Sequence, residues 1–422
     1  MRILFVSSQY PPYELGGYEQ LCHEVTTDLL TRGHDVRVLT SRYGIHSEDE
    51  IHVGNVTRSL HLMADIHYYK PLDFFLKLPS QEKKNLAELK QVIDQFKPDI
   101  VMFWGMFGMS HTLPYWAEKW MPGRTTYYMA SYWPIDEDLH MAYWMSSANR
   151  WVTEQLKQVL RTFALARLKR TGYPPKLQFE NVICCSSYVR DRLVDDGIFP
   201  SSAYVVYAGA DPAPFQNQRS KKEFASESTI RLLYFGRLVP DKGVHTAIEA
   251  IGLLKKNGLA DQVELTILGD GHPDYKNLLH RRVEELGIAD HVHFSGKVAR
   301  EDIPEKLSHF DVFLFTSIWP EPFGRTIVEA MMAGLVVIGS DVGGSREIFQ
   351  HYDKEMLFQP EDAQGLADRI IRIISDSGLG QRLIDSGRRL AFERFTIHQM
   401  TNGIEKFLID VSKHADVSES AQ

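Results

Sequence analysis

The chain has 422 residues, of which 44% are hydrophobic and 24% charged, an ordinary globular composition that excludes a disordered chain, a collagen and a coiled coil. At this length we expect two or three domains. The 47 Lys and Arg residues are outnumbered by 55 Asp and Glu, so no overall basic field is available to hold a nucleic-acid backbone. Three cysteines are too few for a disulfide framework and lack zinc-site spacing.

Strands and helices alternate through the first half of the chain. An apolar run at 3–7, a glycine-containing loop at 13–18, a helical pattern at 19–31 and a second apolar run at 35–40 form a βαβ unit. The same alternation predicts helices at 81–96 and 187–195 and strands at 99–103, 125–129 and 181–185.

The second half repeats this pattern after residues 214–229, which have few aliphatic side chains and are predicted to be a linker. The predicted strands are 231–235, 263–268, 292–295, 312–315 and 336–339, and the predicted helices are 243–256, 275–286 and 326–333. We therefore expect two α/β domains, 1–213 and 230–395. A helix over 396–413, which could return to the first domain, and a frayed tail at 414–422 would follow.

The first strand is too short for a signal-peptide core, and no stretch approaches the ~18 apolar residues of a membrane span. We expect a cytoplasmic protein. The segment 144–170 mixes aromatic and aliphatic residues with Arg and Lys, and two interpretations stay open for it. It could lie as a basic amphipathic helix on the inner face of a membrane, or pack on the first domain with a solvated basic face.

Motifs are densest in the second half, at 235–243 (FGRLVPDKG), 268–271 (LGDG) and 320–334 (PEPFGRTIVEAMMAG). Arg237 and Lys242 follow the carboxyl end of a predicted strand, where open α/β sheets bind ligands. A guanidinium fork and a movable ammonium together suit a pyrophosphate. The alternative is a pair of solvated loop cations.

Two glutamates frame the last of these motifs. Phe323 and Gly324 lie where a loop enters a predicted helix, so their backbone N–H groups could meet an anion or a sugar hydroxyl. Glu329 falls in the first turns of that helix, where its carboxylate could accept both hydroxyls of a ribose. The alternative is that Glu321 and Glu329 are unrelated surface residues.

Taken together, these motifs resemble a known family. The spacing from Glu321 to Glu329 is the E-x7-E pattern of retaining glycosyltransferases, and GR-x4-KG at 236–243 and GDG at 269–271 accompany it in the family's order. Segments 7–20, 341–349 and 208–215 are also similar to family segments, the last departing from the commoner Asn-Gly-Val-Asp. The resemblance is to glycosyltransferase family four, over about residues 1–395. It implies the GT-B fold, in which two Rossmann-like, doubly wound parallel-sheet domains face a central cleft.

The resemblance also implies roles for individual residues. Arg237 and Lys242 would contact the donor diphosphate, and Glu321 the donor sugar at the reacting face. The other implied donor-binding residues are Gly16, Gly17, Gly271, Lys297, Val298, Phe323, Gly324 and Glu329. At 16 and 17, glycine would remove the Cβ that blocks close approach of the diphosphate.

One position departs from the family pattern. After the strand 125–129 the family commonly has His-Asp, whereas this chain has Ala130-Ser131. Either a backbone carbonyl takes over the contact with the donor sugar, or His111 substitutes. Residues 136–138 (DED) match a metal-binding D-x-D pattern of the other glycosyltransferase fold, but Arg237 and Lys242 already supply positive charge. We therefore predict an exposed acidic loop, with neither a metal site nor a cofactor.

The expected function is a hexosyltransferase that moves a sugar, of the glucose type, from a nucleoside diphosphate to an acceptor hydroxyl with retention of configuration. A uridine donor is favoured as the family's commoner choice. The acceptor could be a sugar phosphate, a lipid or a glycan, and the acceptor candidates are Arg42, Lys70, His111, Ser131 and Arg190. Two other functions stay open, a sugar-nucleotide epimerase and a catalytically silent nucleotide-binding module.

Overall fold

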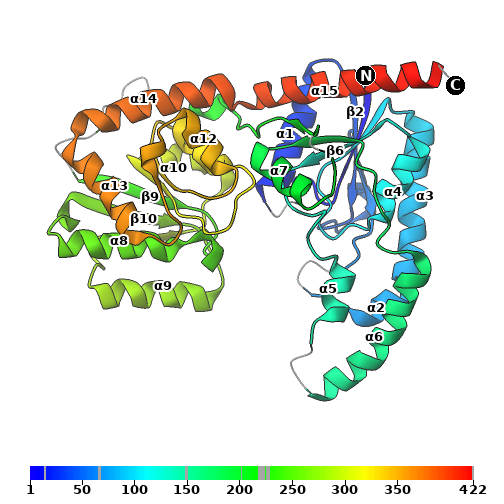
Figure 1. Cartoon of the computed structure of the whole chain (residues 1–422), viewed down its shortest axis with the longest axis horizontal. Helices are drawn as coiled ribbons and strands as arrows, with labels where there is room; N and C mark the ends of the chain where they lie inside the picture. The colour runs from blue at the N-terminus through cyan, green and yellow to red at the C-terminus, as the bar shows by residue number, and fades with distance from the viewer. Residues whose placement is uncertain are drawn as a thin grey trace. The chain divides into compact units, whose positions relative to one another are not determined.

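The computed structural model describes the whole chain except residues 14–15, 65–67, 148–150, 201, 217–223, 225–228 and 421–422 (Figure 1). The chain divides into two compact units. Unit 1 comprises residues 1–185, 189–206 and 401–422, and unit 2 comprises residues 186–188 and 207–400. Most of the predicted linker, at 217–223 and 225–228, lies outside the described residues.

Unit 1 is built on an eight-stranded sheet in the order β3-β4-β2-β1-β5-β6-β7-β8. Neighbouring strands are parallel except for the antiparallel pair β3–β4. The central strand β1 is buried from its second residue onward, which accounts for its continuous apolar sequence. The strands are β1 (Arg2–Ser7), β2 (Asp35–Ser41), β3 (His52–Val53), β4 (Val56–Leu60), β5 (Ile100–Phe103), β6 (Thr125–Met129), β7 (Asn181–Cys184) and β8 (Tyr204–Val205).

Seven α-helices of the first 206 residues accompany this sheet in the described part of unit 1, and an eighth, α15 (Ile397–Ser420), joins them from the end of the chain. The seven are α1 (Gly17–Thr31), α2 (Pro71–Leu76), α3 (Leu78–Phe96), α4 (Thr112–Trp120), α5 (Leu139–Met145), α6 (Trp151–Thr171) and α7 (Ser187–Asp195). The first two residues of α7, Ser187 and Tyr188, are grouped with unit 2.

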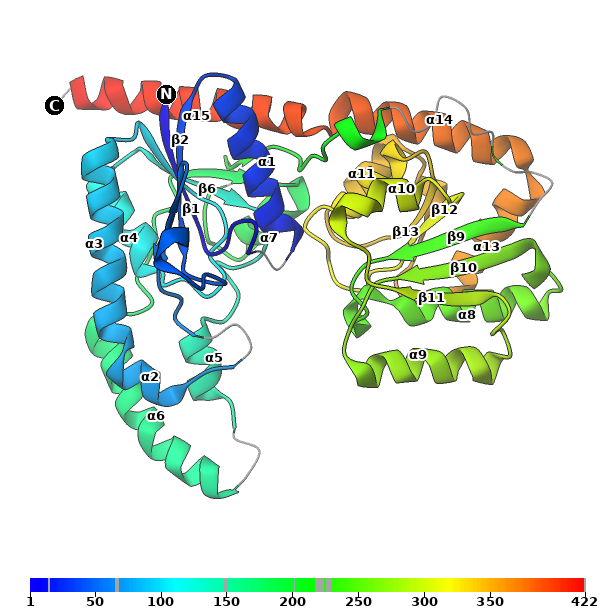
Figure 2. The same ribbon diagram turned by 180° about the vertical axis from the view of Figure 1, so that it is seen from behind.

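Unit 2 contains a six-stranded parallel sheet in the order β11-β10-β9-β12-β13-β14. Figure 2 shows α8 and α9 on one face of this sheet and α10 and α11 on the other. The strands are β9 (Ile230–Phe235), β10 (Val263–Leu268), β11 (Val292–Gly296), β12 (Val312–Phe315), β13 (Val336–Ser340) and β14 (Leu357–Phe358). The helices are α8 (Val244–Lys256), α9 (Pro273–Leu286), α10 (Ile303–Leu307), α11 (Arg325–Met332), α12 (Ser345–His351), α13 (Ala363–Ser375) and α14 (Ser377–Arg394).

The fold class expected from the sequence, two doubly wound parallel sheets, is confirmed. In each sheet, successive strands are first added on one side of the first strand and then on its other side. This switch point lies between β1 and β5 in unit 1 and between β9 and β12 in unit 2. Ligands of open α/β sheets bind beyond the carboxyl ends of the strands at such points. The loops that follow β9 and β12 carry Arg237, Lys242 and Glu321.

Two elements differ from the sequence expectation. The last helix, α15 (Ile397–Ser420), continues through most of the tail that we expected to be frayed, and its residues from 401 onward belong to unit 1. In the expected tail, Asp416 accepts a hydrogen bond from Arg124 Nη2 at 2.5 Å, and Ala415 is buried. These contacts on unit 1 stabilise the helix beyond its predicted end.

The segment 144–170 is also not one helix. Trp144 belongs to α5 and is fully buried, and α6 begins at Trp151. A solvated basic face is wrong for Lys157, which is only 6% exposed and donates hydrogen bonds to Ser146. Arg161 also points inward and donates to the Ser146 carbonyl at 3.0 Å.

Candidate functional site

Glycines allow the loops after β9 and β10 to lie against each other. Leu238 donates its backbone N–H to the Asp270 carbonyl at 2.8 Å, and Gly236 donates to the Leu268 carbonyl at 3.0 Å. A Cβ at Gly269, whose φ is +152°, would overlap the Gly236 carbonyl oxygen, and one at Gly271 would overlap that of Leu238. Gly271 therefore has a role in the fold of unit 2, apart from any role toward a donor.

Lys242 lies where the loop after β9 meets the loop after β12. Its carbonyl accepts a hydrogen bond from Thr316 Oγ1 at 2.9 Å, and a Cβ on the next residue, Gly243, would overlap the Thr316 carbonyl oxygen. The Lys242 ammonium forms an ion pair with the Glu321 carboxylate. These two side chains are 24% and 14% exposed, so the pair is partly shielded from water. The predicted diphosphate cation is thus paired with the predicted sugar-contacting carboxylate.

Glu321 is held from several directions. Ser317 Oγ donates to its carboxylate at 2.8 Å, and Gly344 N donates to its backbone carbonyl at 2.7 Å. At Gly343, with φ of +53°, a Cβ would overlap the Glu321 backbone. The segment at 341–349 that resembles the family therefore positions Glu321, a role that its sequence alone did not indicate.

Arg237 is exposed, and the structure gives its guanidinium no ion-pair partner among the described residues. Its backbone is fixed by Tyr234, whose hydroxyl donates to the Arg237 carbonyl at 2.9 Å. A fixed backbone with an uncommitted cation suits an anionic ligand.

Glu329 is buried on α11 and faces two guanidinium groups. Its Oε1 atom is 3.1 Å from Arg300 Nη2 and 3.4 Å from Arg325 Nε. Sequence reasoning missed Arg300, although it follows the predicted donor-binding residues Lys297 and Val298 by only a few positions. The two arginines orient the carboxylate predicted to bind ribose, and a ribose would have to share it with them.

The remaining predicted donor-binding residues of unit 2 lie at the same edge of the sheet. Lys297 and Val298 directly follow β11, and Lys297 is exposed. The Phe323 side chain is buried against Tyr207 and Phe395, with ring centroids 5.7 and 5.5 Å apart. Only its backbone is therefore available for the predicted contact. Gly324 has a φ of +100° and precedes the first turn of α11.

In unit 1, the predicted diphosphate-binding glycines begin α1. Gly16 is in an extended conformation that any residue adopts, and its N–H donates to Glu19 Oε2 at 3.1 Å. A Cβ at Gly17 would have no atom of the described residues within 4 Å, and one at Gly16 would lie 3.8 Å from Glu19. At Gly16 and Gly17, unlike at Gly269 and Gly271, the surrounding protein leaves room for a side chain.

The next residue, Tyr18, reaches the position where the family commonly has histidine. Its hydroxyl lies 2.5 Å from the carbonyl oxygens of both Trp104 and Tyr128, and it accepts the Ala130 N–H at 3.3 Å. Burial raises the pKa of Tyr18 well above its usual value, so the hydroxyl stays protonated. Tyr18 thereby fixes the backbone at Ala130.

His111, the alternative to a backbone contact, precedes α4 and lies among aromatic rings. Its ring centroid is 5.2 Å from that of Trp133 and 6.4 Å from that of Tyr173. Burial lowers its pKa. This enclosure favours the backbone at Ala130 over His111 as the replacement.

Comparison with known proteins adds an independent observation. Residues 15–214 match the sequence model of "Glycosyltransferase Family 4", and residues 215–390 match that of "Glycosyl transferases group 1". The two matches are consecutive and together span both units. The chain belongs to the family-four glycosyltransferases.

Relatives of this glycosyltransferase cover nearly its whole length. The glycogen synthase of Mycobacterium tuberculosis is 26% identical over 415 residues, 92% of this chain and 90% of the relative. Anabaena HepE, solved in complex with UDP, superimposes with a TM-score of 0.70 at 21% identity, covering 97% and 100% of the two chains. Sucrose-phosphate synthase from Thermosynechococcus elongatus gives 0.66 at 18% identity, covering 100% of both. These structures confirm the GT-B fold.

The acidic loop of the transferase has a structural role. Asp138 caps α5 by accepting the His140 N–H at 2.9 Å, and it also accepts the Tyr173 hydroxyl at 2.8 Å. It is therefore less exposed than we expected, whereas Asp136 and Glu137 are exposed. In the described part of the chain no group of three or more His, Cys, Asp or Glu side chains could hold a metal ion.

The acceptor candidates each have different neighbours. Arg42 pairs with Glu48 at 2.9 Å, Arg190 pairs with Asp191 at 2.8 Å, and the Lys70 ammonium lies 4.8 Å above the Tyr68 ring. Ser131 lies in the turn after β6.

A cavity of about 540 Å³ in unit 1 is lined by different residues. They include Glu82, Trp116, His140, Arg167 and Lys176. Sequence reasoning missed this cavity because its residues come from four separate segments of the chain.

Proposed function

We propose that this family-four enzyme is a retaining transferase that moves a sugar, of the glucose type, from a uridine diphosphate donor to an acceptor hydroxyl. The observation that carries the proposal is the cluster of Arg237, Lys242 and Glu321 on interlocked loops at the switch point of unit 2. HepE has been solved with UDP and with UDP-glucose, which supports a uridine donor for this chain.

The charges of this cluster fit the electrostatics of the reaction. As the glycosidic bond breaks, negative charge grows on the leaving diphosphate, and Arg237 and Lys242 stabilise it. The Lys242 ammonium is paired with the Glu321 carboxylate. A bound diphosphate competes with Glu321 for this ammonium, so the carboxylate becomes available to accept hydrogen bonds from the sugar hydroxyls. The departing phosphate accepts the proton of the acceptor hydroxyl, so no protein nucleophile is required.

The same two cations supply the charge that a divalent metal would supply, and we propose that the reaction needs no metal. The rate should then be unchanged in EDTA. Full loss of activity on chelation, restored by Mg²⁺ or Mn²⁺, would instead point to the carboxylates at 136–138.

For the acceptor, we propose a sugar phosphate. Sucrose-phosphate synthase among the structural neighbours supports this class. The cavity of unit 1 offers two cations, Arg167 and Lys176, together with the aromatic side chain of Trp116. Guanidinium and ammonium groups bind phosphate, and an aromatic face covers the apolar side of a sugar ring.

The test is release of UDP from UDP-glucose by the whole chain, with fructose 6-phosphate as the first acceptor probe and Lys242→Ala as the control. Release that requires the acceptor, with an axial linkage in the product by NMR, supports retaining transfer. An epimerised nucleotide sugar without transfer would indicate the epimerase. No release from any nucleotide sugar in a panel of sugar-phosphate, glycan and lipid acceptors would indicate a binding module.

A further inference from the structure

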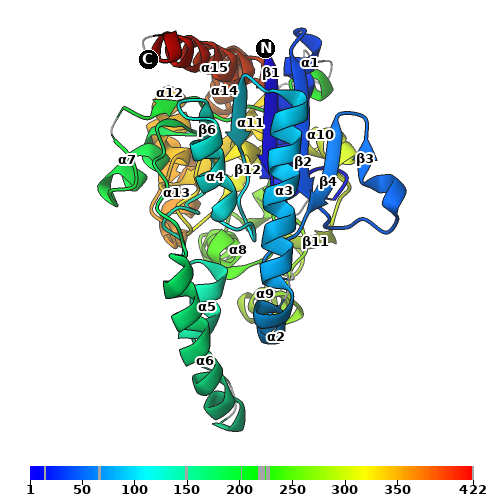
Figure 3. The same ribbon diagram turned by 90° about the vertical axis from the view of Figure 1, so that its right-hand side faces the viewer.

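The outward face of α6 carries a stripe of apolar side chains. Leu156, Val159 and Phe163 are 64%, 57% and 64% exposed. Their spacing of three and four residues places them on one face of the helix. The first turns of α6 extend beyond α2 and α5 in all three views (Figures 1, 2 and 3). We call these three side chains the α6 stripe.

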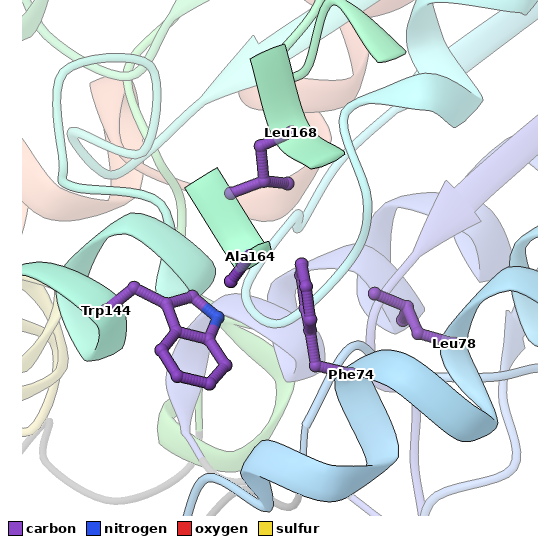
Figure 4. Packing of buried hydrophobic residues seen from close by; sticks show 5 residues of the cluster. All are labelled: Phe74, Leu78, Trp144, Ala164 and Leu168. Carbon is purple, nitrogen blue, oxygen red and sulfur yellow. The ribbon is translucent and has the colours of Figure 1, made fainter. Parts of the chain in front are cut away.

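The opposite face already anchors the helix. Ala164 and Leu168 are buried against Phe74, Leu78 and Trp144 (Figure 4). The α6 stripe therefore takes no part in holding α6 on unit 1.

Cations of the first half of α6 are directed inward, away from the stripe. The Lys157 ammonium lies 4.2 Å from the centroid of the Tyr143 ring and donates to the Ser146 carbonyl at 2.8 Å. A surface helix normally turns its charged residues to water and its apolar residues to the protein. The first half of α6 has the reverse arrangement, so its apolar face lacks a partner within the described residues.

The exposed charged residues of α6 are all cations. The exposed residues of α6 from Thr153 onward include Lys169 and Arg170 and no carboxylate. The one acidic residue of the helix, Glu154, is only 19% exposed and lies 3.6 Å from Arg161. The outward face thus combines large apolar groups with uncharged polar groups and two cations, a composition complementary to an anionic lipid surface.

We propose that the α6 stripe inserts into the headgroup layer of an anionic membrane. Three side chains on one helix fall far short of the ~20–30 residues a side of a stable protein interface. The apolar face of an interfacial helix, by contrast, needs to enter only ~5–10 Å into the headgroup boundary. Among the described residues no helix is long and apolar enough to cross a bilayer, so the contact is peripheral. It does not depend on the proposed reaction.

The test is cosedimentation of the full chain with vesicles of equal parts phosphatidylglycerol and phosphatidylcholine. The parent should bind, and the triple variant Leu156→Ser, Val159→Ser and Phe163→Ser should bind at least about tenfold more weakly. Leu278→Ser, which removes an exposed leucine from α9 in unit 2, is the matched control and should bind like the parent. Thermal unfolding of each variant checks that the fold is retained.

A second variant tests the electrostatic part while leaving the α6 stripe intact. Lys169→Gln with Arg170→Gln should weaken binding to these anionic vesicles by about fivefold per cation and leave binding to pure phosphatidylcholine unchanged. Absence of parent binding, or equal binding by the parent and the triple variant, would overturn the proposal. A parent that is a dimer by sedimentation velocity, with a triple variant that is a monomer, would also overturn the proposal. The α6 stripe would then bind a second copy of the chain.

Discussion

The carboxyl edges of the two sheets are built in different ways. In unit 2, the loops after β9, β10 and β12 are joined by backbone hydrogen bonds, and glycines at 243, 269 and 271 allow the backbones to touch. In unit 1, a backbone hydrogen bond also joins two loops at the corresponding edge, from Ser8 N to the Gly105 carbonyl at 2.7 Å. A side chain adds to it, because the Tyr18 hydroxyl lies among three backbone groups. The edge rich in motifs is therefore the one in which glycines let neighbouring backbones come into direct contact.

This difference separates two uses of glycine that look alike in the sequence. Gly269 and Gly271 are needed because a neighbouring carbonyl leaves no room for a Cβ. Gly16 and Gly17 have room for a Cβ within the described protein. A glycine that the fold does not require is a better candidate for close approach of a ligand.

The largest effect should come from the cations of unit 2. Arg237→Ala and Lys242→Ala should each lower kcat by roughly 10²–10³, with a smaller change in donor affinity, because the contact strengthens as the leaving group gains charge. In the double variant, the activation free energy should rise by less than the sum of the two single increases, because both cations stabilise the same developing charge. Lys242→Arg should not restore the full rate. Steady-state rates within about threefold of the parent for both single variants would show that neither cation stabilises the leaving group.

The glycine comparison can be tested by substitution at both edges. Gly269→Ala should lower the free energy of unfolding by roughly 2–4 kcal/mol, because the new Cβ overlaps the Gly236 carbonyl. Gly17→Ala should change it by less than about 0.5 kcal/mol and should still weaken UDP binding. Denaturant unfolding and calorimetry measure the two quantities. Native UDP affinity in Gly17→Ala would remove this residue from the donor site.

Tyr18→Phe tests how much one hydroxyl contributes to the edge of unit 1. It leaves two carbonyl oxygens and the Ala130 N–H without their partner, so the unfolding free energy should fall by about 1–3 kcal/mol. Tyr68→Phe, on an exposed ring, is the control and should be neutral. If both variants unfold like the parent, the edge is held by other contacts.

His140 makes unit 1 sensitive to acid. Burial lowers its pKa to about 4, whereas the unfolded residue titrates near 6.5, so the unfolded chain binds the extra proton first. The contribution of neutral His140 to the free energy of unfolding is therefore complete above about pH 6.5 and is lost as the pH falls toward 4. Between pH 7 and 5 the loss should be about 2 kcal/mol. His140→Gln should show a shallower decline of unfolding free energy over this range, and an unchanged slope would contradict the assignment.

The sequence predicted the two sheets and the position of the cluster, because apolar runs and glycine-rich strand ends are local signals. It did not predict the ion pair of Lys242 with Glu321 or the contact of Arg300 with Glu329, since both join segments far apart in the sequence that only the fold brings together. It also did not predict the inward Lys157, because its environment is set by Ser146 and Tyr143 on a preceding segment. Local patterns thus indicated which residues carry charge, and tertiary packing decided how those charges are paired.

Calorimetric titration of UDP into the parent and Glu329→Gln tests directly whether the switch point of unit 2 binds a nucleoside diphosphate. We predict one UDP per parent chain and about tenfold weaker binding by the variant. A carboxamide loses the charge that Arg300 and Arg325 orient and accepts fewer hydrogen bonds from ribose. Equal affinity in the two proteins, or no binding by the parent, would contradict the account.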